Sequence, residues 1–164
     1  MVEAQDAKHG AIEVRVWLQM VGCVDIFERE LRRRLAKSQI SLARFEVLGH
    51  LDRFTEGLSM RALSERLMVT KGNVSGLIAR MEREGLLNRA TDPEDRRVQI
   101  MRLSGRGKAV FDAVKPVHHE GLRVLMRDVE PGQLTTLYNL LSKLKTSAGI
   151  KKPRVQRQPQ TGRR

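Results

Sequence analysis

Apolar residues recur every three or four positions along most of the chain, which is the period of an amphipathic α-helix. The first such run covers residues 11–34. Its apolar stripe consists of Ile12, Val16, Met20, Val24, Phe27, Leu31 and Leu35. One short neighbouring helix cannot cover a stripe of this length, so the pattern indicates a long helix that packs partly against another chain.

Three shorter helices are predicted next from capping residues and apolar spacing. Ser41 is the predicted N-cap of the first of them, which ends at residues 56–57. Ser59 opens the second helix, and Thr70 is the N-cap of the third. Gly85 stands where a glycine commonly terminates a helix, so the third helix is expected to end there.

The pattern then changes from helical to extended. Residues 87–91 and 97–103 are short extended runs, and the turn-forming sequence DPED separates them, which indicates a β-hairpin. Ser104 is the predicted N-cap of a further long helix with a kink at Pro116, and a last helix follows Pro131. The predicted fold class is therefore mainly α, with one small β-hairpin.

Charge is the outlying property of the composition. The chain has 164 residues, with 31 Lys and Arg against 19 Asp and Glu, and so a net charge of +12. Such an excess repels itself unless it meets a polyanion, so nucleic acid or an anionic membrane surface is the expected partner. Only 4% of the residues are aromatic, which argues against recognition by base stacking.

The two ends of the chain are predicted to lie outside the folded domain. Residues 1–10 are expected to be flexible, and they carry acids but no apolar signal sequence. Residues 148–164 are expected to form a disordered tail, because residues 151–164 contain six basic residues, no acids and two prolines. No apolar stretch approaches the length of a membrane span, so we expect a cytoplasmic protein associated with the nucleoid.

Two short helices followed at once by a β-hairpin describe a winged helix-turn-helix, whose second helix enters the major groove of DNA. In that helix the predicted buried stripe is Val74, Leu77, Ile78 and Met81. The opposite face is small and polar at its N-terminal end. The predicted DNA contacts on this helix are Asn73 and Ser75 to bases, Gly76 for close approach, and Thr70, Lys71 and Arg80 to phosphates. The alternative is that the small residues only permit tight packing.

The tip of the hairpin carries Arg96 and Arg97 next to three acids. A guanidinium inserted into a narrow minor groove gains from the negative potential there. We expect either Asp92 or Asp95 to pair with one arginine and orient it, while the other arginine reaches the groove. A solvated turn with incidental ion pairs is the alternative.

The stretch from Leu58 to Lys108 resembles the winged helix-turn-helix core of MarR-type transcriptional regulators. The DPEDRR wing, the GLL after the recognition helix and the following L-S-x-x-G-K element carry this resemblance. It implies a domain over residues 11–147, with dimerisation helices at 11–37 and 104–147 and a DNA-binding lobe at 41–103. It also implies a homodimer on a pseudo-palindromic operator, with repression relieved by a small ligand. Met68 departs from the glycine that many members have in the turn.

Candidate effector residues are less distinctive. Trp17, Met20 and His50 could line a cavity for an aromatic carboxylate, or could belong to an ordinary core. Cys23 could be a peroxide sensor, as in some members of the resembling family, but its sequence neighbours favour an apolar packing cysteine. His118 and His119 point about 100° apart on a helix and lack further ligands in sequence, so neither a metal nor another cofactor is expected.

The leading hypothesis is a sequence-specific regulator that binds double-stranded DNA, with an affinity that falls steeply with salt. The alternative is a winged-helix module that binds proteins, or that binds DNA without sequence specificity. An enzyme is the weakest hypothesis, because no paired carboxylates, no nucleophile with a spaced base and no phosphate-binding loop stand out.

Overall fold

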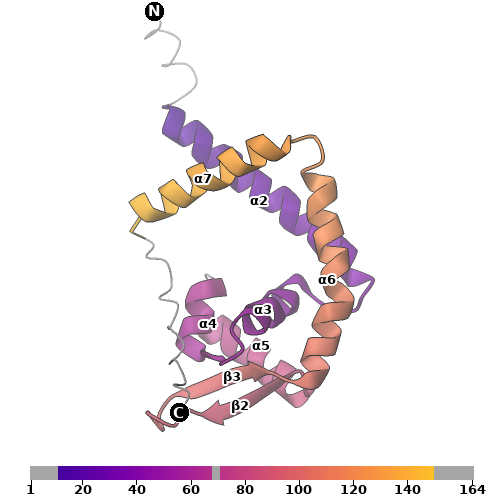
Figure 1. Ribbon diagram of the computed structural model, residues 1–164, viewed down its shortest axis with the longest axis vertical. Coiled ribbons are helices and arrows are strands. Elements are labelled where there is room, and N and C mark those ends of the chain that lie inside the picture. The colour runs from indigo at the N-terminus through magenta and orange to yellow at the C-terminus, as the bar shows by residue number, and fades with distance from the viewer. Residues whose placement is uncertain (1–10, 68–70, 150–164) are drawn as a thin grey trace, which may run out of the picture. The chain divides into compact units, whose positions relative to one another are not determined.

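The computed structural model describes residues 11–67 and 71–149, and the side chains of residues 71–73 are not among those described. The chain divides into two compact units, residues 1–125 and 126–164 (Figure 1). The first unit contains, in order, α2 (Ile12–Ala36), α3 (Leu42–Arg53), β1 (Leu58–Ser59), α4 (Met60–Leu67), α5 (Lys71–Arg83), β2 (Leu87–Thr91), β3 (Gln99–Leu103) and α6 (Gly105–Leu125). The second contains α7 (Pro131–Ser147). The predicted mainly helical fold with a small wing is confirmed.

Serine hydroxyls cap three of the helices where the sequence predicted it. Ser41 Oγ accepts a hydrogen bond from the Arg44 amide at 3.3 Å, and Ser59 Oγ accepts one from the Ala62 amide at 3.1 Å. Ser104 Oγ accepts from the Gly107 amide at 2.9 Å, which starts α6. Each cap satisfies an amide that has no partner within its own helix. The predicted cap Thr70 lies outside the described residues.

The predicted end of α5 is confirmed, whereas the predicted end of α3 is wrong. Gly85 follows α5 with a φ of +71°, the left-handed conformation that a helix-terminating glycine supplies. α3, in contrast, ends at Arg53 with Phe54 as its C-cap, three residues before the expected stop. Gly57, with a φ of +89°, belongs instead to the turn that leads into the sheet.

The sheet has three strands rather than the two of the predicted hairpin. Its order is β1-β3-β2, with both pairs antiparallel. β1 was missed because two residues carry no detectable alternation. β3 begins at Gln99, two residues later than predicted, because Val98 still belongs to the wing turn: its amide donates to the Asp95 carbonyl at 2.9 Å.

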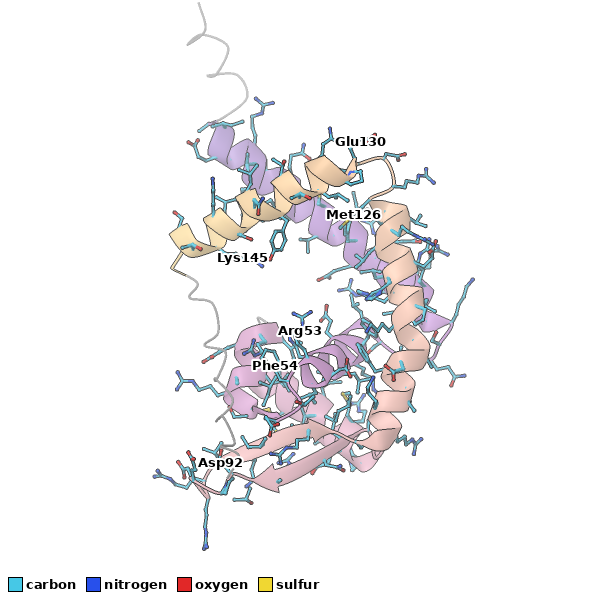
Figure 2. The ribbon with its side chains drawn as sticks, viewed as in Figure 1. Arg53, Phe54, Asp92, Met126, Glu130 and Lys145 are labelled. Carbon is cyan, nitrogen blue, oxygen red and sulfur yellow. The ribbon has the colours of Figure 1, made fainter. Side chains whose placement is uncertain are left out.

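A single apolar core occupies the first unit (Figure 2). It joins the C-terminal end of α2, helices α3, α4 and α5, the sheet, and the N-terminal two-thirds of α6. From its predicted stripe α5 contributes Val74, Ile78 and Met81, each 0 or 1% exposed, whereas Leu77 is only partly buried. Their burial holds α5 against the rest of the lobe and determines which of its faces remains outside.

The C-terminal end of α2 packs against the core, whereas its N-terminal part is exposed to solvent. Near its C-terminus it approaches α6 closely, because Gly121 has no side chain where a Cβ would lie 2.8 Å from Leu31 Cδ2. No residue of α2 before Leu31 is buried by the rest of the chain. Large apolar side chains exposed there are Ile12, Val14, Val16, Trp17, Leu18, Val21, Val24 and Ile26. None of the described helices has the length and hydropathy to cross a membrane.

Within the described residues, the helix of the second unit is α7. Pro131 occupies its start, where proline is favoured, and the Glu130 amide donates to Gln133 Oε1 at 3.0 Å. None of its residues is buried. Its exposed apolar residues are Leu137, Tyr138, Leu140 and Leu144.

Replacing Gly107 by alanine is expected to lower the free energy of unfolding by about 1–3 kcal/mol. A Cβ at this position would lie 2.1 Å from the Leu86 carbonyl oxygen, so the backbone must shift. Gly105 in the same helix has no atom within 4 Å of such a Cβ, which makes Gly105→Ala the matched control. Urea unfolding at one protein concentration measures both variants. Equal losses of stability would contradict the proposed close approach.

Candidate nucleic-acid interface

The outer face of α5 is small, polar and basic. Ser75, Gly76, Ala79, Arg80 and Arg83 are exposed there, opposite the buried stripe. A Cβ added to Gly76 would meet nothing within 4 Å, so this part of the helix surface is open within the chain. The alternative in which the small residues serve internal packing is therefore wrong for Gly76.

The first turn of α5 carries the remaining candidates on this helix. Lys71 and Asn73 lie within the helix, but their side chains are outside the described residues, as is the whole of Thr70. The backbone places both residues at the N-terminal end of α5. That end carries the positive pole of the helix dipole, which favours phosphate.

Two ion pairs hold the C-terminal end of α5 and occupy its acids. Arg44 of α3 pairs with Glu84, and Arg89 of β2 donates to Glu82 Oε2 at 2.8 Å. Within the described residues, Arg80 forms no ion pair. Because the nearby acids are engaged with arginines inside the lobe, the outer face of α5 keeps its positive charge.

The wing tip is shaped by Asp92, which Figure 2 marks at the end of the hairpin. Its Oδ1 accepts hydrogen bonds from the amides of Glu94 and Asp95, at 2.8 and 3.2 Å. Its own amide donates to the Val98 carbonyl at 2.9 Å. Asp92 therefore organises the turn backbone rather than an arginine side chain.

Asp95 pairs with Arg97, which decides between the alternatives left open by the sequence. The Arg97 Nε and Nη2 atoms donate to the two carboxylate oxygens at 3.1 and 3.3 Å, and the Arg97 amide donates to Oδ1 at 3.0 Å. The Arg97 side chain remains 91% exposed, so the pair orients the guanidinium without covering it. Arg96 is exposed and forms no ion pair with any described residue.

The hydrogen bonds from Arg97 stabilise the charged form of Asp95. The side-chain bonds, and then the bond from the Arg97 amide, lower the pKa of the Asp95 carboxyl below its usual 3.8. The wing therefore presents two arginines while one of its three acids stays bound to Arg97 and another to the turn backbone.

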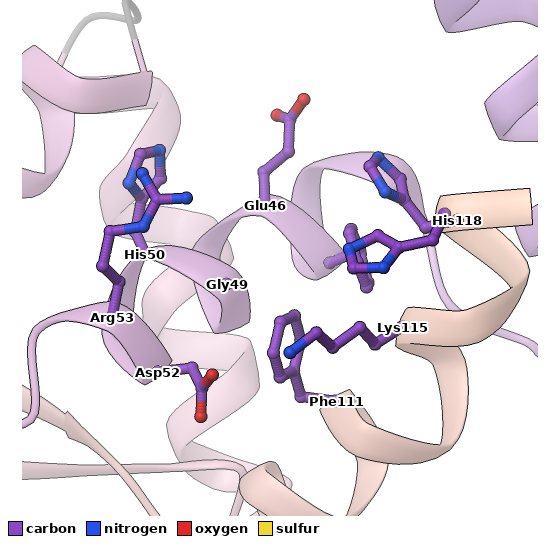
Figure 3. Close-up of a pocket in the computed structure, with 10 residues that line it drawn as sticks. Glu46, Gly49, His50, Asp52, Arg53, Phe111, Lys115 and His118 are labelled. Atoms are coloured by element: carbon purple, nitrogen blue, oxygen red, sulfur yellow. The ribbon is translucent and has the colours of Figure 1, made fainter. Parts of the chain in front are cut away.

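A cavity of about 390 Å³ lies between α3 and α6 in the same unit (Figure 3). Seen in Figure 3, His50 and Arg53 extend from α3 on one side, and Lys115 and His118 extend from α6 on the other. The lining residues are Phe45, Glu46, Gly49, His50, Asp52, Arg53, Phe111, Lys115, His118 and His119.

Burial changes the pKa of three groups in the cavity, His50, His118 and Glu46. It lowers the pKa of His50, with Arg66 and Arg53 adding to the effect. It likewise lowers the pKa of His118, with His119 adding to it. Burial raises the pKa of Glu46, as the neighbouring Glu28 does, while Arg32 opposes them. In each group the shift favours the neutral form.

Only His50 among the three candidate effector residues lines this cavity. Trp17 is 61% exposed on the N-terminal part of α2, and Met20, also on α2, is not among the lining residues. The structure therefore does not bring the three together in this cavity. Cys23 is exposed as well, so its expected burial in an apolar core is wrong for the single chain.

The sequence analysis did not identify the cavity residues of α6, although their spacing indicates that they share one side of the helix. Phe111, Lys115, His118 and His119 follow one another at spacings of four, three and one, which places them along one side of α6. Adjacent histidines in a sequence suggest metal ligands first, which hides their place in this row. The identity of the facing helix could not be read from spacing, because α3 and α6 are about 60 residues apart in sequence.

Comparisons with known proteins agree on one family. A profile described as the MarR family matches residues 38–98, from the turn before α3 to the wing turn. The transcriptional activatory protein BadR of Rhodopseudomonas palustris is 30% identical over 113 residues, which are 68% of this chain and 64% of BadR. The matched region spans between 45 and 64% of the first three curated relatives.

Solved structures share the fold at lower identity. Sco3205, a MarR family regulator from Streptomyces coelicolor solved in complex with DNA, superposes with a TM-score of 0.75 at 23% identity, covering 89% of this chain and 96% of that one. The organohalide-sensing regulator RdhR-CbdbA1625, solved with 2,4-dichlorophenol, gives 0.72 at 20% identity, covering 87% and 84%.

The Asp95–Arg97 pair can be tested by titration. We expect NMR to give a pKa for the Asp95 carboxyl below 3.8, so that the pair breaks only as the pH falls below the usual range of an aspartate. Arg97→Gln removes the charged guanidinium that donates to Asp95 and is expected to raise this pKa, whereas Arg96→Gln is the matched control and leaves it unchanged. The opposite result would show that Arg96 is the partner.

Proposed function

Because the chain belongs to the MarR family of winged helix-turn-helix transcriptional regulators, we propose that it is a sequence-specific regulator that binds double-stranded DNA as a homodimer. The observation that carries this proposal is the juxtaposition of an open, polar face on α5 with two exposed arginines on the wing of the same lobe. Its operator is expected to be pseudo-palindromic, since a two-fold dimer presents two equal lobes.

In this proposal α5 enters the major groove. Asn73 and Ser75 contact base edges, and Gly76 allows the helix backbone to come close to them. Thr70 and Lys71 at the start of the helix, and Arg80 further along, bind phosphates. Engagement of the acids at the end of α5 with Arg44 and Arg89 supports this orientation, because it removes the repulsion that free carboxylates would exert on DNA.

The wing reaches the adjacent minor groove through Arg96 and Arg97. Asp95 orients Arg97, so part of the entropy of ordering this long side chain is lost before DNA binds. Arg96, which forms no ion pair with any described residue, makes a second contact with the groove. The narrow groove at A·T-rich steps is the expected target, because its negative potential is enhanced.

Homodimerisation is supported by the apolar surface of α2. Eight large apolar side chains are exposed on its N-terminal half, which is more than a monomeric protein normally leaves in water. Trp17 and Met20 belong to this surface in our proposal, rather than to the effector cavity. α7, with no buried residue of its own, is the second element proposed to join the interface.

The chain is further proposed to act as a repressor in the cytoplasm, at the nucleoid, with the cavity between α3 and α6 as its effector site. An aromatic carboxylate fits the chemistry of the lining, because Phe45 and Phe111 supply apolar surface while Arg53 and Lys115 supply positive charge. The dichlorophenol-bound structure of RdhR-CbdbA1625 supports an aromatic effector. The ligand would relieve repression by binding better to the form that does not fit DNA.

The experiment that tests DNA recognition is a gel shift with genomic fragments at moderate salt. We expect a subset of fragments to be retarded in the presence of excess competitor DNA, since specific binding exceeds non-specific binding by about 10³–10⁷. Equal retardation of every fragment would favour a non-specific DNA-binding module. No retardation would favour a protein-interaction module. Neither the proposal nor its alternatives give the chain an enzymatic activity.

Arg96→Ala and Arg97→Ala are each expected to weaken binding to a retarded fragment and to reduce the slope of log affinity against log salt by about 1, because one DNA contact is lost. Arg123→Ala is the matched control: it removes an exposed arginine at the far end of α6 from the wing. The dimer should remain folded in all three variants. Unchanged affinity in both wing variants would contradict the minor-groove contact.

A further inference from the structure

Two histidines face the cavity from opposite helices, and neither is an ordinary surface histidine. The His118 ring stacks on Phe45 with ring centroids 4.4 Å apart, and its Nδ1 is buried without a hydrogen-bond partner in the described part of the chain. His50 extends into the same space from α3 (Figure 3). A neutral ring tolerates these surroundings, whereas a protonated ring requires a compensating negative charge.

The charged groups around the cavity come from every helix packed on it. They are Glu28 and Arg32 of α2, Glu46, Asp52 and Arg53 of α3, Arg66 of α4, and Lys108, Asp112, Lys115 and His119 of α6. Lys108 Nζ lies 3.3 Å from Asp52 and is hydrogen-bonded to Asp112 at 2.6 and 2.7 Å, and burial favours the neutral form of Glu46. The charges that oppose protonation are those of Arg66 and Arg53 at His50, and that of His119 at His118.

We propose that His50 and His118 make this cavity selective for anions by taking up protons when an anionic ligand binds. An anion between α3 and α6 reverses the local field, because its charge lies among Arg53, Lys115 and the two rings. An opposite charge within ~4–6 Å commonly raises the pKa of a histidine by about 1–3. Rings that are neutral in the free protein at pH 7 then become protonated donors to the ligand.

This inference deepens the proposed effector function and rests on it. Proton uptake makes affinity depend on pH: for each proton bound with the ligand, affinity rises by a factor approaching ten per unit fall in pH. A neutral ligand of the same shape has no charge to reverse the field, so it gains nothing from the histidines. The pair thus discriminates charge, whereas the phenylalanines recognise only the aromatic ring.

The test is calorimetric titration of the full chain with benzoate at pH 7, in buffers of different ionisation enthalpy, with benzyl alcohol as the neutral probe. The dependence of the observed enthalpy on the buffer gives the number of protons bound. We expect between one and two protons with benzoate and none with benzyl alcohol. We also expect benzoate to bind more tightly at pH 6 than at pH 7.5.

Three variants assign the protons to residues. His118→Gln and His50→Gln are each expected to reduce the uptake, and the variant that carries both substitutions is expected to abolish it. Circular dichroism checks that the variants fold. Uptake that survives both His118→Gln and His50→Gln would overturn the assignment.

The possible outcomes distinguish a failure of this inference from a failure of the proposed effector site. Benzoate binding without proton uptake would overturn the inference and leave the effector site in place. No benzoate binding between pH 6 and 8 would overturn both the inference and the aromatic carboxylate as effector. The gel shift of the free protein is independent of either result, so DNA recognition is judged separately.

Discussion

The burial of one face of α5 is the constraint on which the rest of the structure depends. Val74, Ile78 and Met81 are almost completely removed from solvent, and each contributes roughly 1.5–3 kcal/mol of apolar transfer free energy. A helix held in this way cannot rotate about its axis without exposing that surface. Its opposite side, with Ser75, Gly76 and Arg80, is therefore kept outside the lobe.

The distribution of acids within the lobe complements that constraint. A net charge of +12 is not enough for a DNA-binding surface, because carboxylates next to the contact residues would repel phosphate. Glu82 and Glu84 are bound to arginines of neighbouring elements, and Asp92 and Asp95 are used by the wing itself. These four acids are thus engaged within the lobe, whereas Arg80 and Arg96 are exposed and form no ion pair with any described residue.

The sequence predicted features that depend on local spacing and missed those that depend on distant contacts. The buried stripe of α5, three serine caps and the ends of β2 follow from periods and capping chemistry within a few residues. β1 acquires strand character only by pairing with β3, about 40 residues later. The cavity likewise needs α3 to meet α6, so only His50 of its lining was anticipated. The choice of Asp95 over Asp92 required side-chain geometry.

Selection of bound sequences from a pool of random DNA duplexes, followed by footprinting of the enriched site, tests the central claim most directly. The account predicts a pseudo-palindrome whose two halves lie one helical turn, about 34–36 Å, or a multiple of it apart, with major-groove protection in each half and minor-groove protection beside it. Recovery of unenriched sequences, with protection spread evenly along the duplex, would contradict the assignment of α5 and the wing as elements that read DNA.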